Sequence, residues 1–216
     1  MYQFNFSISK TVTKNTTSYP ISLSDVKSVS QFYIANPTDT SIDAYATAII
    51  PKIVNDWEKS TNYLLLDQAI QSFVPNLETI FTDQINIGFP HLNIREFTNI
   101  KYHKPDWNYS DSKSIIDNSN YFIIAEINDC PAKLNIKSPY LPLNLFPIIN
   151  NLEANYKAGF ANNDFTNLDK TIKDALIYQV AMVVDALKGF CEDFYSTMIK
   201  EAYAQYSITK QVASII

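Results

Sequence analysis

Apolar side chains recur at helical spacing at both ends of this chain and at strand spacing between them. The first helical pattern runs from about Ser24, the expected N-cap, to Ile34. The second begins near residue 40 and continues past Pro51, which we expect to kink or weaken the helix. Its apolar stripe consists of Ile42, Tyr45, Ala46, Ile49, Ile50, Ile53, Val54 and Trp57.

Two further helices are predicted in the C-terminal part. The first has a regular apolar stripe and ends at the C-cap Lys188-Gly189. Its stripe consists of Ile172, Ala175, Leu176, Val180, Val183, Val184 and Leu187. The last helix has apolar residues four apart, at Phe190, Phe194, Met198, Ala202 and Tyr206.

Short β-rich runs separated by proline and polar residues fill the middle of the chain. They are Leu64–Val74, Ile80–Ile87, Ile94–Tyr102, Tyr121–Ile127, Lys133–Ile136 and Leu152–Tyr156. The first of these runs also fits a continuing helix. Gly159 is one of only three glycines and follows the last run. We therefore expect a turn with positive φ, or a close backbone approach, at Ala158-Gly159-Phe160.

These patterns predict an α+β fold, with a four-helix bundle-like core (two N-terminal and two C-terminal helices) and a central β-rich insertion. We expect an N-terminal arm at 1–20, a helical bundle from 21–63 and 160–206, a β-rich insertion at 64–159 and a C-terminal tail at 207–216. The arm alternates apolar and polar residues from Tyr2 to Ile8. That alternation fits an edge strand, a strand added to a neighbouring subunit, or a frayed terminus.

Charge and composition exclude several classes of function. The 216 residues carry a formal net charge of −5, and the 17 basic residues are scattered, which argues against a phosphate-binding surface. No apolar run is long enough for a membrane span, and we predict no secretory signal. Cys130 and Cys191 are expected to remain thiols, with a disulfide between them as the alternative.

Reactive side chains form no recognisable catalytic or metal-binding motif, so we predict no enzyme, no cofactor and no metal. The two histidines, His91 and His103, lack ligand spacing. Cys191 adjoins two acidic residues, which disfavours a thiolate nucleophile. Carboxylates that meet only in the folded chain remain an enzyme alternative.

Aromatic residues suggest two kinds of contact. Trp107 and Tyr109, in the predicted loop 104–120, fit stacking on a sugar or insertion into a partner, and Tyr121 would complete such a site. Tyr195, Tyr203 and Tyr206 fit either a subunit interface or the core of their own subunit.

Three stretches together resemble the head–tail connector (adaptor) proteins of tailed bacteriophages and gene transfer agents. The first is Leu23-Ser24-Asp25-Val26-Lys27, followed by Ser41–Tyr45 and Asp56–Asn62, which is similar to the opening helices of that family. The second is Ile94–Tyr102 after Pro90. The third is Tyr156-Lys157-Ala158-Gly159-Phe160 followed by Ile172–Leu176.

The resemblance implies a structural, non-enzymatic protein of the virion neck, assembled in the host cytoplasm. It implies a homo-oligomeric ring, commonly of twelve copies, that binds the portal and then the stopper or tail, while genome DNA passes through without specific binding. A C-terminal segment would dock on the portal, and the candidate interface residues are Ile208, Val212, Ile215, Ile216, Tyr203 and Tyr206. A β-rich module that binds carbohydrate or a host surface is the alternative function.

Overall fold

The computed structural model divides the chain into two compact units. It describes residues 3–5, 8–74, 84–102, 114–116, 121–124, 132–137, 152–190 and 193–206. One unit, the β unit, contains Met1–Lys14 and Asp67–Gly159, and the other, the helical unit, contains Asn15–Leu66 and Phe160–Ile216. The chain therefore passes from one unit to the other three times.

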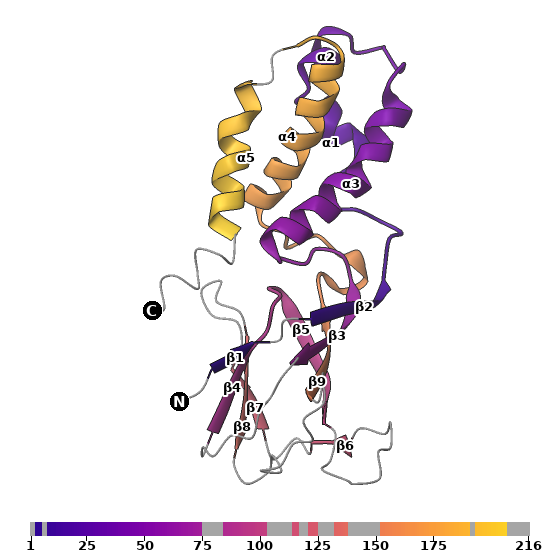
Figure 1. Ribbon diagram of the computed structural model, residues 1–216. Coiled ribbons are helices and arrows are strands. Elements are labelled where there is room, and N and C mark those ends of the chain that lie inside the picture. Colours follow the sequence, from indigo (N-terminus) through magenta and orange to yellow (C-terminus); the bar gives the residue numbers. More distant parts are fainter. Residues whose placement is uncertain are drawn as a thin grey trace. The chain divides into compact units, whose positions relative to one another are not determined.

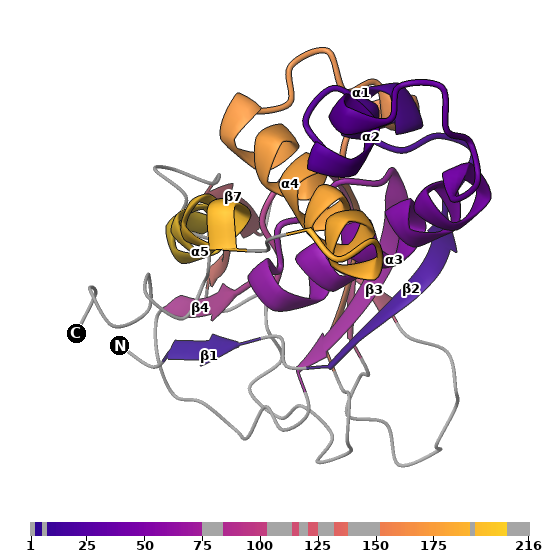
Figure 2. The same ribbon diagram turned by 90° about the horizontal axis from the view of Figure 1, so that it is seen from above.

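The helical unit contains five described α-helices, so the predicted four-helix bundle-like core is not confirmed. They are α1 (Leu23–Lys27), α2 (Gln31–Ala35), α3 (Asp43–Thr61), α4 (Lys170–Leu187) and α5 (Asp193–Tyr206), with a 3₁₀ turn η2 (Ala161–Asn163) before α4. Helix α4 contacts each of the other four (Figures 1 and 2). The α+β class itself is confirmed.

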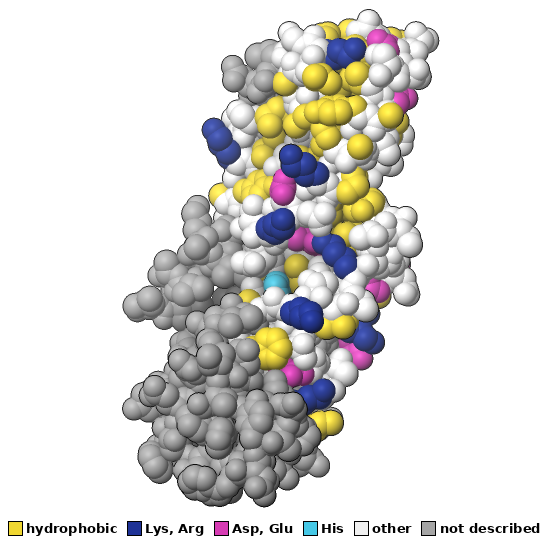
Figure 3. All heavy atoms as spheres, turned by 45° about the vertical axis from the view of Figure 1, so that its right-hand side comes forward, with side chains coloured by type: hydrophobic (Ala, Val, Ile, Leu, Met, Phe, Trp, Pro, Cys, Tyr) yellow, Lys and Arg dark blue, Asp and Glu magenta, His cyan; other side chains and the backbone are white. Residues whose placement is uncertain are grey.

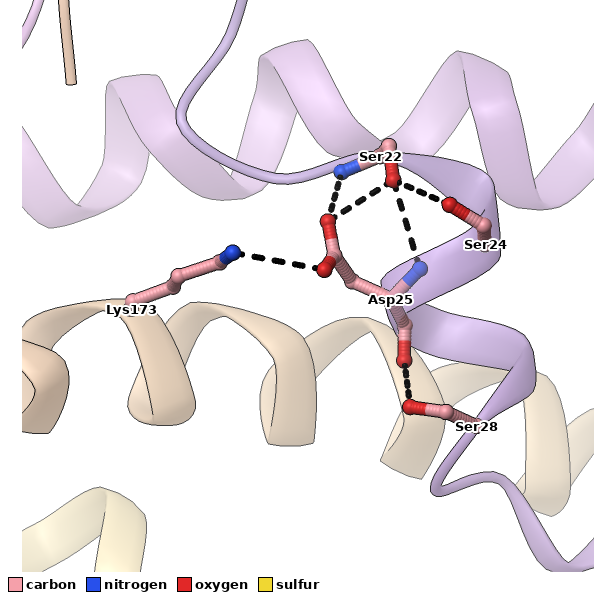
Figure 4. A network of polar contacts seen from close by, with 5 residues as sticks. All are labelled: Ser22, Ser24, Asp25, Ser28 and Lys173. Atoms are coloured by element: carbon pink, nitrogen blue, oxygen red, sulfur yellow. Dashed lines mark hydrogen bonds and ion pairs between the residues drawn. The ribbon is translucent and has the colours of Figure 1, made fainter. Parts of the chain in front are cut away.

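The predicted single helix from Ser24 to Ile34 is two short helices, and its N-cap is Ser22 rather than Ser24. The Ser22 hydroxyl accepts the Asp25 amide at 3.3 Å, and the Asp25 carboxylate accepts the Ser22 amide at 2.8 Å (Figure 4). This reciprocal pair is a capping box, which satisfies two amides left unpaired at a helix start. Lys173 of α4 lies 3.3 Å from the same carboxylate and ties α1 to α4.

Helix α3 continues through Pro51, as the stripe predicted, and buries Ala46, Ile50, Val54 and Trp57. The helix ends at Asn62, whose φ of 56° is left-handed, a conformation that asparagine tolerates better than most residues. Just beyond, one oxygen of the buried Glu58 carboxylate accepts the amides of Leu65 and Leu66, each at 2.8 Å. The chain that leaves α3 is therefore hydrogen-bonded back to it.

Three predicted stripe positions are wrong, because Tyr45, Leu187 and Met198 are 44%, 55% and 46% exposed. Tyr45 and Leu187 lie at the edges of their stripes and near helix ends. Met198 belonged to a series spaced four apart, and such a series drifts by about 40° per step on a helix with 3.6 residues per turn. It cannot stay on one face, and α5 instead buries Tyr195, Ala202 and Tyr206.

The described strands of the β unit form two sheets. The four-stranded sheet has the order β1 (Gln3–Asn5), β4 (Gln84–Gly88), β8 (Lys133–Lys137), β7 (Tyr121–Ile124). The five-stranded sheet has the order β2 (Ile8–Lys14), β3 (Gln68–Val74), β9 (Leu152–Ala158), β5 (Ile94–Tyr102), β6 (Ser114–Ile115) (Figure 1). Strand β1 pairs in parallel with β4, and the other described pairs are antiparallel.

Each of the six predicted β-rich runs overlaps a strand, and the run 94–102 matches β5 at both ends. The ambiguous run Leu64–Val74 becomes a strand from Gln68, with alternate residues buried. Residues 8–14 form the edge strand β2, which pairs with β3 of the same chain. Within the alternating stretch Tyr2–Ile8 itself, the described residues 3–5 form β1, which lies at the end of the four-stranded sheet and pairs with β4, so the edge-strand alternative is correct for them.

Gly159 has a φ of 82°, as its scarcity and position predicted. It ends β9, and its amide donates to the Asn93 carbonyl at 3.0 Å. The next amide, that of Phe160, donates to the Leu65 carbonyl at 3.0 Å. Lys14 at the end of β2 and Ala158 at the end of β9 both lie opposite Gln68 at the start of β3, so the three places where the chain enters or leaves the β unit are on neighbouring strands.

Replacing Pro51 with alanine should stabilise the helical unit. Alanine restores the amide that proline lacks and so returns a hydrogen bond to the Thr47 carbonyl, for an expected gain of about 1–3 kcal/mol in the free energy of unfolding. Denaturant unfolding followed by circular dichroism measures it. Lys52→Ala is the matched control at the exposed next position, with an expected change within about 0.5 kcal/mol. A Pro51→Ala variant with a lower free energy of unfolding than the unchanged chain would contradict the prediction.

Candidate functional site

The candidate interface residues fall into two groups. Tyr203 and Tyr206 lie in the last turns of α5. The other four, Ile208, Val212, Ile215 and Ile216, lie outside the described residues. The structure therefore describes only the part of the candidate interface where α5 packs on α3 and α4. In the sequence, α5 is followed by the predicted tail.

Tyr203 and Tyr206 contribute to an aromatic cluster within their own helical unit. The Trp57 ring lies 4.7 Å from the Tyr203 ring and 6.0 Å from the Tyr206 ring, and Tyr63 meets Tyr206 edge-on at 5.4 Å. Trp57 is fully buried and Tyr206 nearly so. In this chain the two tyrosines therefore pack α5 against α3, as the core alternative for them predicted; a role in an interface stays a prediction.

The buried Tyr206 and the half-buried Tyr203 each also make a polar contact with α4 or its N-cap. The hydroxyl of Tyr206 donates to Asp169 at 2.8 Å, and that of Tyr203 accepts from the Gln179 amide at 2.8 Å. Asp169 is the N-cap of α4 and accepts the Thr171 amide at 2.6 Å. The hydrogen bond from the Tyr206 hydroxyl lowers the pKa of Asp169 most, and the bond from the Thr171 amide comes next. Together they hold this pKa below its usual range. Burial raises the pKa of Tyr203.

The third tyrosine, Tyr195, contacts Asp185, a fully buried carboxylate near the end of α4. One carboxylate oxygen accepts the Ser30 hydroxyl at 2.5 Å and the Phe32 amide at 3.0 Å. The other accepts the Gln31 amide at 2.9 Å and the Tyr195 hydroxyl at 2.8 Å. Asp185 thus joins α2, α4 and α5 through four hydrogen bonds.

Helix electrostatics explain why a negative charge is tolerated at this buried position. A carboxylate in the last turn of α4 faces the negative end of its own helix. Here the carboxylate instead meets the first two amides of α2, which are unpaired donors at a positive helix end. Burial, followed by the neighbouring Asp185 carboxylate, raises the pKa of Tyr195. The phenol therefore remains a donor at neutral pH.

Asp185 is the residue that sequence reasoning missed. It interrupts the run Val183-Val184-Asp185-Ala186-Leu187. The sequence does carry one signal of its role, since a carboxylate on the apolar side of a helix is buried only where hydrogen-bond or ionic partners meet it. The partners themselves lie 155 residues upstream at Ser30 and 10 residues downstream at Tyr195, so no local motif identifies them.

Other candidate chemistry is limited. In the described ranges, no three His, Cys, Asp or Glu side chains are grouped as metal ligands. His91 lies between β4 and β5, against Tyr156. His103, Trp107, Tyr109, Cys130 and Cys191 lie outside the described residues. No helix in the described part of the chain has the length and hydropathy to cross a membrane.

The helical unit exposes several large apolar side chains. Ile34 of α2, Leu187 of α4, Met198 of α5 and Tyr45 of α3 are each more than two-fifths exposed. Figure 3 shows apolar side chains gathered on one face of this unit, with few charged groups between them. Such surfaces are typical of proteins that contact other proteins.

Two chains in solved structures share this fold. One belongs to the neck of an empty gene transfer agent particle, computed with C6 symmetry. It has a TM-score of 0.56 and 11% identity, covering 82% of this chain and 84% of that chain. The second belongs to the virion of a native gene transfer agent particle, with a TM-score of 0.52, 13% identity and the same coverage.

No family model and no curated protein sequence matches the chain. At 11–13% identity the structural likeness establishes a common fold. The resemblance to phage and gene transfer agent neck proteins, first indicated by three sequence stretches, is confirmed at the level of that fold.

Replacing Asp185 with alanine should cost about 3–5 kcal/mol of unfolding free energy, because four donors lose a buried acceptor. Tyr195→Phe removes one of these bonds and should cost about 1–2 kcal/mol. Urea unfolding measures both. Asp174→Ala, on the same helix but not fully buried, is the control, with an expected change below about 0.5 kcal/mol. Equal effects of Asp185→Ala and Asp174→Ala would refute the assignment.

Proposed function

We propose that this chain is a non-enzymatic structural subunit of the neck of a phage-like particle. The observation that carries the proposal is the common fold over 82% of the chain with a chain from the neck of a gene transfer agent particle. That likeness spans both units, because neither unit alone accounts for 82% of the residues. The same particle type appears in the second match.

Within the neck, the proposed role is that of an adaptor. Identical copies form a ring that binds the portal on one side and the stopper or tail on the other, with twelve copies as the expected number. The exposed apolar side chains of the helical unit support association with other protein surfaces. The symmetry of the neck that contains the similar chain supports a cyclic arrangement.

The proposed portal contact is the tail that follows α5. Residues 207–216 contain Ile208, Val212, Ile215 and Ile216 at its apolar positions. The polar and aromatic contacts of α5 with α3 and α4 hold the helix that precedes this tail in the sequence. A tail anchored in this way can order on a partner without moving the helical unit.

The net negative charge of the chain supports a ring that does not bind the genome specifically. A chain with a net charge of −5 gives a ring no electrostatic reason to retain DNA that passes through it. We therefore propose that DNA passes without specific binding. The alternative function, a carbohydrate- or host-surface-binding module, gains no specific support, since Trp107 and Tyr109 lie outside the described residues.

A binding experiment with the portal of the same particle tests this function. The full chain should co-sediment with portal rings and appear as an added ring in negative-stain images. The pair Ile215→Asp with Ile216→Asp should weaken this binding at least tenfold, because two buried apolar contacts would be replaced by charges. Analytical ultracentrifugation against portal concentration measures the loss.

The control carries the same added charge at polar positions of the same tail, as Ser207→Asp with Ser214→Asp. We expect this pair to bind within about threefold of the unchanged chain, since surface charges away from the contact contribute little. A chain that never associates with the portal would overturn the adaptor role. Equal losses in the two pairs would overturn the tail contact alone.

A further inference from the structure

The contact between α3, α4 and α5 contains two buried polar atoms that have no hydrogen-bond partner among the described residues. One is Nε1 of the Trp57 indole on α3, which is a donor. The other is Oε1 of the Gln179 amide on α4, which is an acceptor. Native proteins pair nearly all such atoms, either with a protein group or with an ordered water, because an unpaired buried atom lowers stability.

Tyr203 of α5 brings these two atoms close together. The Tyr203 ring lies 4.7 Å from the Trp57 ring, measured between centroids, and the Tyr203 hydroxyl accepts Nε2 of Gln179 at 2.8 Å. Oε1 belongs to the same amide group as Nε2, so it lies on the next atom but one from that hydrogen bond. Helices α3, α4 and α5 all contact one another, and they converge at the C-terminal half of α3 (Figures 1 and 2).

Direct contacts do not balance the donors and acceptors at this point. The Tyr203 oxygen accepts from Gln179, so the hydrogen of that hydroxyl is still available for donation. Two hydrogens, from Trp57 and Tyr203, therefore meet one acceptor oxygen, from Gln179. Exchanging the oxygen and nitrogen of the Gln179 amide does not help. It would place an N–H₂ group where Oε1 now lies, beside the indole N–H, with no acceptor for either.

One water molecule matches this set of groups. It can accept from Trp57 Nε1 and from the Tyr203 hydroxyl, and it can donate to Gln179 Oε1. Buried waters typically make about three hydrogen bonds of this kind, to polar groups that would otherwise be unpaired. A cation would be repelled by the indole and phenol hydrogens, and an anion by the amide oxygen. A small neutral molecule that both donates and accepts therefore fits best.

We propose that one ordered water is bound between Trp57, Gln179 and Tyr203 and joins α3, α4 and α5. The water belongs to the interior of the helical unit, since Nε1 and Oε1 are both buried and Trp57 is fully so. It completes the hydrogen bonds of one residue from each of the three helices. This site is independent of the proposed neck function, because it depends only on contacts inside one helical unit.

A crystal structure of the full chain, at a resolution that defines ordered waters, tests the site directly. We expect density for one water within about 3.2 Å of Trp57 Nε1, the Tyr203 hydroxyl and Gln179 Oε1. Absence of this density would overturn the proposal. A protein group bonded directly to Trp57 Nε1, from residues 207–216 or elsewhere, would overturn it as well.

NMR spectroscopy gives a second measurement in solution, because the chain has only two tryptophans. Trp107→Phe leaves one indole N–H signal, that of Trp57. We expect water cross-peaks at this signal with NOE and ROE of opposite sign, which mark a long-lived bound water. Gln179→Met keeps the side-chain length but has no amide oxygen, so it should abolish these cross-peaks. Gln205→Met, at an exposed glutamine of α5, is the matched control and should keep them.

Exchange of the Tyr203 hydroxyl hydrogen with solvent is a competing source of such cross-peaks. Tyr203→Phe removes this hydroxyl but leaves Trp57 Nε1 and Gln179 Oε1 for the water, so the cross-peaks should persist. Their loss in Tyr203→Phe, or their persistence in Gln179→Met, would overturn the proposal. If Gln179→Met does not fold, the crystal structure and Tyr203→Phe decide.

Discussion

A chain that leaves one unit at residue 66 and returns to it at residue 160 must bring both ends of the intervening segment together, and the pairing of β3 with β9 meets this constraint. Gln68 at the start of β3 lies opposite Ala158 at the end of β9. Immediately outside the sheet, Leu65 and Phe160 share a backbone hydrogen bond. If this register slipped by one residue, the buried Tyr156 would turn to the opposite side of the sheet. The core of the β unit and the connection to α4 both depend on it.

In the helical unit, two buried carboxylates hold separate segments of the chain together, and both accept hydrogen bonds from backbone amides. Glu58 accepts the amides of Leu65 and Leu66, and Asp185 accepts those of Gln31 and Phe32. Each compensates for donors that a helix end or a loop would otherwise bury unpaired. In a chain with so few glycines, side-chain oxygens supply caps and turns that a different composition would achieve with backbone conformation alone.

Periodicity predicted most elements because each helix or strand has one buried side. Neighbouring residues alone were enough to predict the apolar stripes of α3 and α4 and the strand β5. The division between α1 and α2 was not, because Asp185, about 155 residues away, stabilises the start of α2. The series of hydrogen bonds that joins Ser9, Ser72, Tyr156 and His91 escaped sequence reasoning for the same reason, since these four residues come from four separate segments.

Of the candidate site, only Tyr203 and Tyr206 lie on described residues, and their contacts could not be predicted from spacing. An aromatic residue on the apolar side of a terminal helix fits a core and an interface equally well. Trp57 contacts both rings, while Asp169 and Gln179 are the hydrogen-bond partners of the Tyr206 and Tyr203 hydroxyls. The sequence carried no sign of those partners beyond their own helical patterns.

The edge strand β2 has a consequence for the solubility of the chain. Its pairing with β3 shifts register between Thr11 and Thr13, so Val12 is left out of the ladder. Together with Lys10 and Lys14, this irregularity prevents a long, straight, uncharged edge from facing solvent. An incoming strand meets only short regular stretches on either side of Val12. A concentrated solution of this chain would thus be protected from edge-to-edge aggregation at β2.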